Sequence, residues 1–126
     1  MEQESVRAER KNMIYAVDFD GTLCTSCWPD IGSPNVILID WLKRQREKGE
    51  KLILWTCREG ELLRAAVEWC EWMGLKFDAV NENLPENIEY YGSDCRKVHA
   101  DIYIDDKSLQ LETVNRMIEI LERKKK

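Results

Sequence analysis

An apolar segment followed directly by two carboxylates constrains this chain more than any other feature. Residues 13–17 read Met-Ile-Tyr-Ala-Val, which has the length and the β-branched and aromatic content of a buried strand. Asp18 and Asp20 stand at its carboxyl end, and Gly21 permits a sharp turn just after them. Because ligands in open α/β sheets bind outside the carboxyl ends of the strands, we expect a reaction centre here. The structural alternative is an Asp-rich turn that merely ends the strand.

Strand and helix patterns alternate along the rest of the chain. Strands are expected over residues 13–18, 51–55, 76–80 and 100–104. The first helix is expected to begin at Ser33-Pro34 and to end at Gly49. Two further helices are indicated by apolar residues at helical spacing: Leu62, Ala66, Trp69 and Met73, then Leu111, Val114, Ile118 and Leu121.

The ends of these helices and the segments between them complete the expected fold. Gly74 is expected to end the second helix and Ser108 to cap the third, while residues 19–33 and 81–96 are expected to be loops. Such alternation implies parallel strands joined by right-handed crossovers. The predicted fold is therefore α/β, a three-layer α/β/α sandwich around a parallel, Rossmann-like sheet. Four tryptophans have core-like spacing and are expected to pack inside: Trp41, Trp55, Trp69 and Trp72.

Length and composition indicate a single globular domain. The chain has 126 residues, of which 44% are hydrophobic and 34% charged, which is enough for one core and too little for two. Residues 1–12 carry many charges and are expected to form a mobile leader, so that residues 13–126 form the domain. No apolar run approaches the roughly 20 residues of a membrane span, and we expect a cytoplasmic protein.

Net charge and cysteine content limit the kinds of molecule and metal that we expect the protein to bind. A net charge of −5 argues against bulk attraction to nucleic acid or to an anionic membrane. The five cysteines are expected to be reduced thiols in a cytosolic protein. Cys24 and Cys27 form a C-x-x-C pair, which would require Cys95 and His99 to complete a zinc site, and we favour reduced thiols over that alternative.

Four polar motifs occur in a fixed order along the predicted strands. Residues 18–22 (Asp-Phe-Asp-Gly-Thr) follow the first strand, Thr56 ends the second, Lys97 precedes the last and Asp105-Asp106 ends it. This arrangement resembles the four motifs of the haloacid dehalogenase-like (HAD) superfamily, and the motifs together span most of the chain. The resemblance implies a HAD-like fold and a Mg²⁺-dependent phosphatase that forms an aspartyl-phosphate intermediate.

The resemblance also assigns roles to the carboxylates. Asp18 would attack phosphorus, and Asp20 would protonate the leaving alcohol and then accept a proton from the hydrolytic water. Mg²⁺ would be held by Asp18, the backbone carbonyl of Asp20 and Asp105, with Asp106 acting through water or orienting Lys97. The structural alternative for Asp105 and Asp106 is an acidic cap on the last helix.

Four further residues would contact the phosphorylated substrate. Thr56 would bind the phosphate through its hydroxyl and Lys97 would pair with Asp18, the alternatives being a helix cap and a surface charge. Residues 56–58 (Thr-Cys-Arg) also resemble HAD phosphatases of the polynucleotide 3′-phosphatase type, which would put Cys57 and Arg58 near the substrate. A plain surface charge is the equal alternative for Arg58.

The intervals between the motifs are too short for the cap domain that many HAD enzymes carry. We expect a capless enzyme with an open site, with Tyr90 and Tyr91 as a partial lid and Trp28 as a candidate substrate contact. Open sites suit phosphate groups on large molecules, nucleic acid among them as a substrate only, or small ones covered by a neighbouring subunit of a homo-oligomer.

Two alternative functions remain open at this stage. A phospho-acceptor receiver domain also uses acidic metal ligands, a Thr or Ser and a Lys, but its phosphorylated Asp follows the third strand, where this chain has Asn81. A catalytically idle HAD fold that serves as a binding module is the other alternative.

Overall fold

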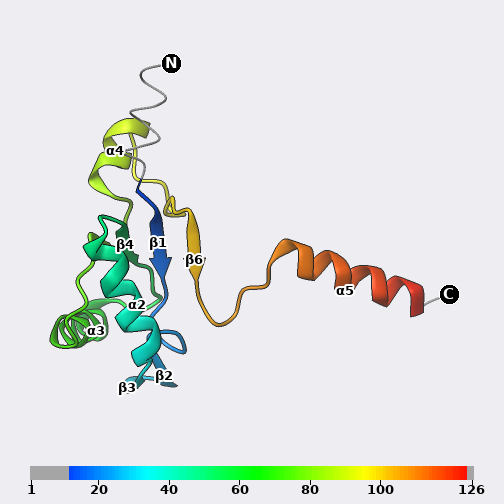
Figure 1. Cartoon of the computed structure of the whole chain (residues 1–126), viewed down its shortest axis with the longest axis horizontal. Coiled ribbons are helices and arrows are strands. Elements are labelled where there is room, and N and C mark those ends of the chain that lie inside the picture. The colour runs from blue at the N-terminus through cyan, green and yellow to red at the C-terminus, as the bar shows by residue number, and fades with distance from the viewer. Residues whose placement is uncertain (1–11, 125–126) are drawn as a thin grey trace.

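The protein is a mixed α/β structure built on a four-stranded parallel sheet, seen in a computed structural model that describes residues 12–124 (Figure 1). The strands are β1 (Ile14–Val17), β4 (Lys51–Leu54), β5 (Ala79–Val80) and β6 (Ile102–Ile104), in the spatial order β5-β4-β1-β6. All four strands fall within the segments expected from the sequence. The leader expected over residues 1–12 lies, apart from residue 12, outside the described residues.

Strand β1 is central and is paired in parallel on both sides. Val17, its last residue, stands opposite Leu54 of β4 and Ile104 of β6, so these three strands end at the same level. Counted along the chain, the sheet has the order third, second, first, fourth strand. The order therefore reverses direction between β1 and β6, and the carboxyl ends of those two strands flank the reversal.

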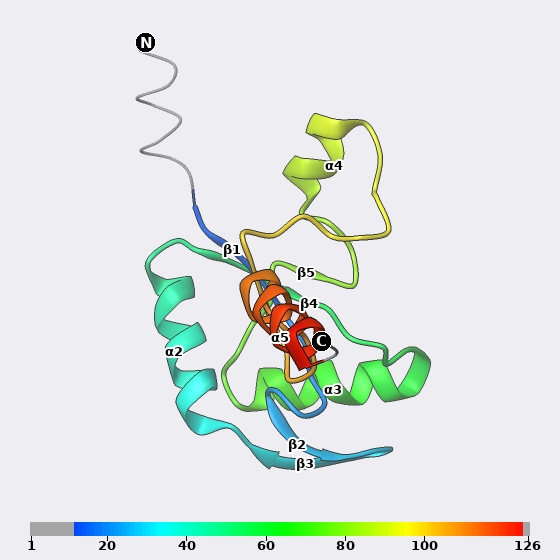
Figure 2. The same ribbon diagram turned by 90° about the vertical axis from the view of Figure 1, so that its right-hand side faces the viewer.

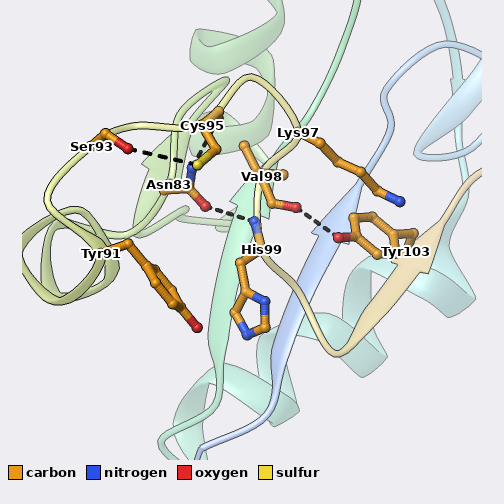
Figure 3. Close-up of a pocket in the computed structure, with 8 residues that line it drawn as sticks. All are labelled: Asn83, Tyr91, Ser93, Cys95, Lys97, Val98, His99 and Tyr103. Atoms are coloured by element: carbon orange, nitrogen blue, oxygen red, sulfur yellow. Dashed lines mark hydrogen bonds between the residues drawn. The ribbon is translucent and has the colours of Figure 1, made fainter.

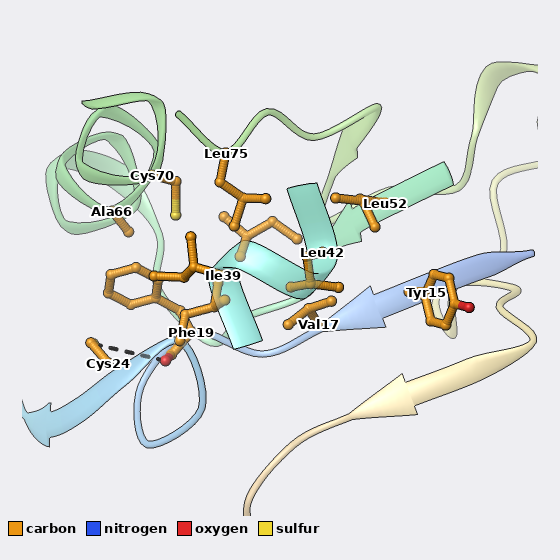
Figure 4. Packing of buried hydrophobic residues seen from close by; sticks show 12 residues of the cluster. Tyr15, Val17, Phe19, Cys24, Ile39, Leu42, Leu52, Ala66, Cys70 and Leu75 are labelled. Carbon is orange, nitrogen blue, oxygen red and sulfur yellow. Dashed lines mark hydrogen bonds between the residues drawn. The ribbon is translucent and has the colours of Figure 1, made fainter. Parts of the chain in front are cut away.

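Helices α2 (Val36–Glu47) and α3 (Gly60–Trp72) cover one face of the sheet and enclose the main core (Figure 4). Alternate residues of β1 and β4 point into this core, including Val17, Leu52 and Leu54, none of which is exposed to solvent. The helices contribute Ile39, Leu42, Ala66 and Cys70, which recur at the spacing of one helical face. Trp69 packs edge-on against Phe19 with ring centroids 5.5 Å apart.

Two of the expected features of these helices are wrong. Helix α2 does not begin at Ser33-Pro34, because Pro34 is the last residue of a strand; Asn35 is the cap, and its side-chain oxygen accepts a hydrogen bond from Leu38 N at 3.2 Å. Trp72, at the end of α3, is 83% exposed and does not pack inside. The expected stops are present, since Gly49 and Gly74 have positive φ angles of 95° and 83° directly after the helices.

A β-hairpin occupies the segment that was expected to be a loop over residues 19–33. Strands β2 (Cys24–Cys27) and β3 (Asp30–Pro34) pair antiparallel, with Cys24 opposite Pro34 and Cys27 opposite Asp30. The Thr25 hydroxyl oxygen accepts a hydrogen bond from Ser33 N at 2.8 Å. The hairpin lies at the end of the sheet where β1 finishes (Figure 1).

The opposite face of the sheet is covered by residues 81–100, which also contain a helix where a loop was expected. Helix α4 (Pro85–Tyr91) begins with Pro85 and ends before Gly92, whose φ angle is 77°. A buried Asn83 fixes the rest of the segment, because its side chain donates to Asp94 Oδ1 and Cys95 O and accepts from His99 N at 2.6 Å. Leu84 and Val98 thereby close over Ala16 and Ile53 of the sheet.

Helix α5 (Leu111–Lys124) forms as expected but extends away from the sheet, as Figures 1 and 2 show from two sides. Most of its apolar residues are exposed, among them Leu111 at 74% and Ile118 at 50%, and none of its side chains is buried. Ser108 does not cap this helix, because its hydroxyl donates to Asp105 instead, at 2.8 Å. No helix among the described residues is both long and apolar enough to span a membrane.

Candidate active site

The candidate site lies at the carboxyl edge of the sheet, where β1 passes between its two neighbours. Asp18 N donates to Ile104 O of β6 and Trp55 N donates to Val17 O of β1, each at 2.9 Å. The residues that follow the three strands, Asp18, Trp55 and Asp105, therefore form one row across this edge. The row contains the first carboxylate of the motif after β1 and the first of the pair after β6.

The carboxyl of Asp18 is surrounded by other negative charges. Burial raises its pKa above the usual value of 3.8, and the nearby carboxylates of Asp106, Asp20 and Asp105 raise the pKa further. A hydrogen bond from Phe19 N to Asp18 Oδ1, 2.7 Å long, acts in the opposite direction. Burial is the larger cause of the raised pKa, and the neighbouring carboxylates add to it.

Asp20 is paired with Arg58, which is the most deeply buried cation near the site. Arg58 Nε donates to Asp20 Oδ2 and Arg58 Nη2 donates to Asp20 Oδ1, both at 2.8 Å. The Arg58 side chain is only 1% exposed, whereas that of Asp20 is 22% exposed. The surface-charge alternative for Arg58 is therefore wrong, and its pKa is raised chiefly by the hydrogen bonds to Asp20.

The two carboxylates after β6 have different surroundings. Asp106 lies against Gly21, where a Cβ atom would overlap its carboxylate, and the φ angle of 80° at position 21 also favours glycine. Asp105 accepts hydrogen bonds from Lys107 N at 3.0 Å and Ser108 N at 2.7 Å, as well as from the Ser108 hydroxyl. These bonds to Ser108 and Lys107 hold the pKa of the Asp105 carboxyl below its usual value.

Thr56 and Cys57 begin the loop between β4 and α3. The Thr56 hydroxyl oxygen accepts from Arg58 N at 3.2 Å, and Thr56 N donates to Asn81 Oδ1 at 2.8 Å. Cys57 is exposed on this loop. Asn81 was not identified from the sequence as part of the site, although a polar residue directly after a strand was the available signal. Its φ angle of 53° lets its amide bridge the Thr56 loop, because Asn81 Nδ2 also donates to Arg58 O at 3.4 Å.

Lys97 lies beside the aromatic ring of Tyr103 of β6, with its amine 5.2 Å from the ring centroid (Figure 3). Lys97 forms no ion pair with a carboxylate among residues 12–124, so its expected pairing with Asp18 is not seen in this arrangement. It lines two adjoining pockets. One, of about 350 Å³, is bounded by Tyr91, His99 and Tyr103, and the other, of about 590 Å³, reaches Trp55 and Asp105.

In the part of the chain that the structure describes, the site thus combines several carboxylates with one paired cation, Arg58. Within the described residues no three acidic, histidine or cysteine side chains converge closely enough to hold a metal ion. The chemistry of the donors still fits a hard cation, because they are carboxylate oxygens and those of Asp106, Asp20 and Asp105 lie close enough to Asp18 to raise its pKa in addition to burial. The tyrosines expected to form a lid, Tyr90 and Tyr91, belong to α4, at the end of the sheet opposite the hairpin (Figure 1).

Fold and site together define a parallel α/β protein with an acidic site at the carboxyl edge of its sheet. No protein-family model and no curated protein matches the chain. A solved structure of a conserved protein coded by a locus from Bacteroides thetaiotaomicron is similar, with 40% sequence identity and a TM-score of 0.69. The similarity covers 86% of this chain and 91% of that one. The chain belongs to the family of that conserved protein.

Proposed function

We propose that the protein is a phosphatase of the HAD type that hydrolyses phosphate monoesters through an aspartyl-phosphate on Asp18. The observation that carries this proposal is the position of Asp18, at the point where the strand order reverses between β1 and β6. Its carboxyl is half-buried, and its pKa is raised by burial and by Asp106, Asp20 and Asp105. A carboxylate in such surroundings suits nucleophilic chemistry on a phosphate that arrives with a cation.

The order of the strands argues against the receiver alternative. Receiver domains share the flavodoxin-like order 2-1-3-4-5, with the reversal between the first and third strands. In this chain the order is third, second, first, fourth, so the reversal lies between β1 and β6. The acidic residues of the candidate site follow those two strands, and this placement supports the HAD arrangement.

The proposed reaction uses side chains that meet at this edge. Asp18 attacks phosphorus as the bond to the leaving oxygen breaks, and Asp20 delivers a proton to that oxygen. Water then attacks phosphorus, its proton passes to Asp20 and the bond to Asp18 breaks. Thr56 and the backbone N–H groups of its loop bind the phosphate oxygens, and Lys97 reaches them by turning from the Tyr103 ring.

Mg²⁺ is the proposed cofactor. Asp18, the backbone carbonyl of Asp20 and one carboxylate of the 105–106 pair would hold it, and it would neutralise charge on the phosphate. Of that pair, Asp106 is the one whose carboxylate lies against the motif after β1, at Gly21. Asp105 has a competing role in the turn before α5, through its bonds to Lys107 and Ser108.

We further propose that the site has no folded cap. The segment after β1 is the short hairpin of β2 and β3, and the segment between β5 and β6, residues 81–101, contains the seven-residue helix α4. An open edge of this kind admits phosphate on a large molecule, or on a small one if a second subunit covers the site.

Phosphate release from 4-nitrophenyl phosphate and from a panel of nucleotides, sugar phosphates and phosphopeptides tests the proposal, with and without Mg²⁺. We expect metal-dependent turnover that falls by about 10³-fold or more in Asp18→Asn. Asp40→Asn, which changes an exposed carboxylate on α2, is the matched control and should leave turnover unchanged.

A second measurement does not depend on the choice of substrate. Beryllofluoride with Mg²⁺ imitates a phosphoryl group on an aspartate, and it should raise the melting temperature of the wild type but not of Asp18→Asn. Absence of both turnover and this stabilisation would contradict the proposed function and favour an idle binding module.

A further inference from the structure

A buried arginine connects Asp20 to three other parts of the molecule. Besides its two bonds to Asp20, Arg58 Nη2 donates to Asp30 O of the hairpin at 3.0 Å, and Nη1 donates to Leu62 O of α3 at 3.4 Å. The guanidinium carbon lies 5.0 Å from the ring centroids of both Phe19 and Trp28. Arg58 is therefore held by aromatic rings and backbone carbonyls as well as by its carboxylate partner.

This environment leaves Arg58 little freedom to serve as an ordinary ligand for a substrate. Its side chain is 1% exposed, and its fork of N–H groups is directed at Asp20, Asp30 and Leu62. Asp20, by contrast, keeps 22% of its side-chain surface in contact with solvent. Solvent, and with it a substrate, therefore reaches the Asp20 side chain but not the Arg58 side chain.

We infer that Arg58 is a positioning residue that fixes the Asp20 carboxyl for proton transfer, and that the hairpin fixes Arg58; the inference rests on the proposed phosphatase function. A bidentate guanidinium sets both the place and the plane of a carboxyl group. When Asp20 gives its proton to the leaving oxygen, the guanidinium stabilises the carboxylate that remains. When water later attacks, the same carboxylate is already oriented to accept the proton.

The hairpin belongs to this arrangement because it supplies two of the contacts. The Asp30 carbonyl accepts from the guanidinium, and the Trp28 ring covers it from the outside while remaining 57% exposed. Movement of the hairpin therefore displaces Arg58 and, through it, Asp20. Trp28 accordingly acts on proton transfer without touching the reacting atoms.

The test compares two phosphate esters that differ in their need for a proton. A 4-nitrophenolate leaves readily as an anion, whereas an alkoxide such as that of glycerol phosphate requires a general acid, which typically contributes 10²- to 10⁴-fold. We expect Arg58→Lys, which cannot form the bidentate pair, to lower kcat/KM for the alkyl ester about 10- to 100-fold more than for the aryl ester. Because both esters are measured on one preparation, the ratio cancels any loss of folded protein.

Three further variants make the result specific. Asp20→Asn should raise the ratio of kcat/KM for the aryl ester to kcat/KM for the alkyl ester, and this rise should be the largest of any variant. Adding Arg58→Lys to Asp20→Asn should change that ratio no further. Trp28→Leu, an exposed change in the hairpin, should change the ratio less, by about three- to tenfold. Arg64→Lys is the control, because Arg64 is 68% exposed and, within residues 12–124, pairs only with Glu61 and Glu68 on α3.

The outcomes separate the two proposals. Equal losses on both esters in Arg58→Lys would give Arg58 a purely structural role and overturn the inference while the phosphatase function stands. Additive effects in the double variant would overturn it as well. A wild type that hydrolyses neither ester, nor any of the wider panel, and gains no stability from beryllofluoride with Mg²⁺ would overturn the proposed function and this inference together.

Discussion

Among the described residues, α2 and α3 enclose twelve buried apolar side chains on one face of the sheet, whereas five are buried on the other face, beneath a segment held by Asn83. The first face is apolar and its residues recur at strand and helix spacing. The second depends on hydrogen bonds between a side chain and backbone groups 12 to 16 residues further along. The comparison indicates that packing supports the first face and a polar network supports the second.

Neighbouring residues of β4 provide the most direct way to test this difference, and the largest expected effect. Leu54 points to the first face and Ile53 to the second, and neither is exposed. Truncation of either to Ala should cost about 2–5 kcal/mol in the free energy of unfolding, with Leu54→Ala the more costly because its tightly packed surroundings collapse less. Urea denaturation of both variants measures this, and a larger loss for Ile53→Ala would reverse the comparison.

The polar network is tested by Asn83→Ala, with an expected loss of about 1–3 kcal/mol. The substitution leaves His99 N and Cys95 O without their side-chain partner, whereas Asp94 Oδ1 still accepts a hydrogen bond from the backbone N of residue 83. Asn87→Ala is a suitable control, because Asn87 Nδ2 is buried without a hydrogen-bond partner among the described residues. Hydrogen exchange at the His99 amide should accelerate in Asn83→Ala alone. Equal losses of stability in the two variants would mean that the network contributes nothing particular to the second face.

A buried thiol makes the first face sensitive to alkaline pH. Burial raises the pKa of Cys70 from 9.0 to about 12, so the folded state keeps the thiol protonated. The resulting stabilisation is complete below pH 9 and is lost as the pH rises toward 12, by about 1 kcal/mol at pH 10. Unfolding free energies at pH 8 and pH 10 should therefore fall more for the wild type than for Cys70→Ala. Parallel pH dependence in the two proteins would contradict this.

The smallest effect on the free energy of unfolding is expected for a residue that packs on neither face of the sheet. Ile118 lies on α5 and is 50% exposed, so Ile118→Ser should change the free energy of unfolding by no more than about 0.5 kcal/mol. The same urea titration measures it. A loss above 1 kcal/mol would mean that α5 is covered in solution, by its own sheet or by a second chain.

Local patterns in the sequence predicted well the face of the sheet that α2 and α3 cover and the edge at which the strands end. The run of residues before Asp18 is a buried strand, and positive φ angles at Gly49 and Gly74 follow the helices that those glycines were expected to end. Parallel pairing then brings Asp18 and Asp105 into one row, because β1 and β6 end at the same level. Such features follow from periodicity and topology, which a single sequence carries.

The features that the sequence did not predict depend on contacts between distant segments. The hairpin over residues 24–34 has no apolar alternation, and part of its support comes from Arg58, which lies 28 residues beyond Asp30. Helix α4 buries none of its side chains, so only Pro85 and Gly92 signalled it. The two residues of the Arg58–Asp20 pair are 38 positions apart in the sequence, and no rule of residue spacing predicts such a pair.

The contacts of Arg58 also have a consequence for the order of folding. Its partners come from three segments, namely Asp20 after β1, Trp28 and Asp30 of the hairpin, and Leu62 of α3, so the guanidinium completes its contacts only after these segments have met. We expect these contacts to be absent from the transition state for folding, so that Arg58→Lys accelerates unfolding more than it slows folding, which stopped-flow rates in urea measure. Arg58, which positions Asp20, would then also slow unfolding, and its removal would shorten the lifetime of the native state.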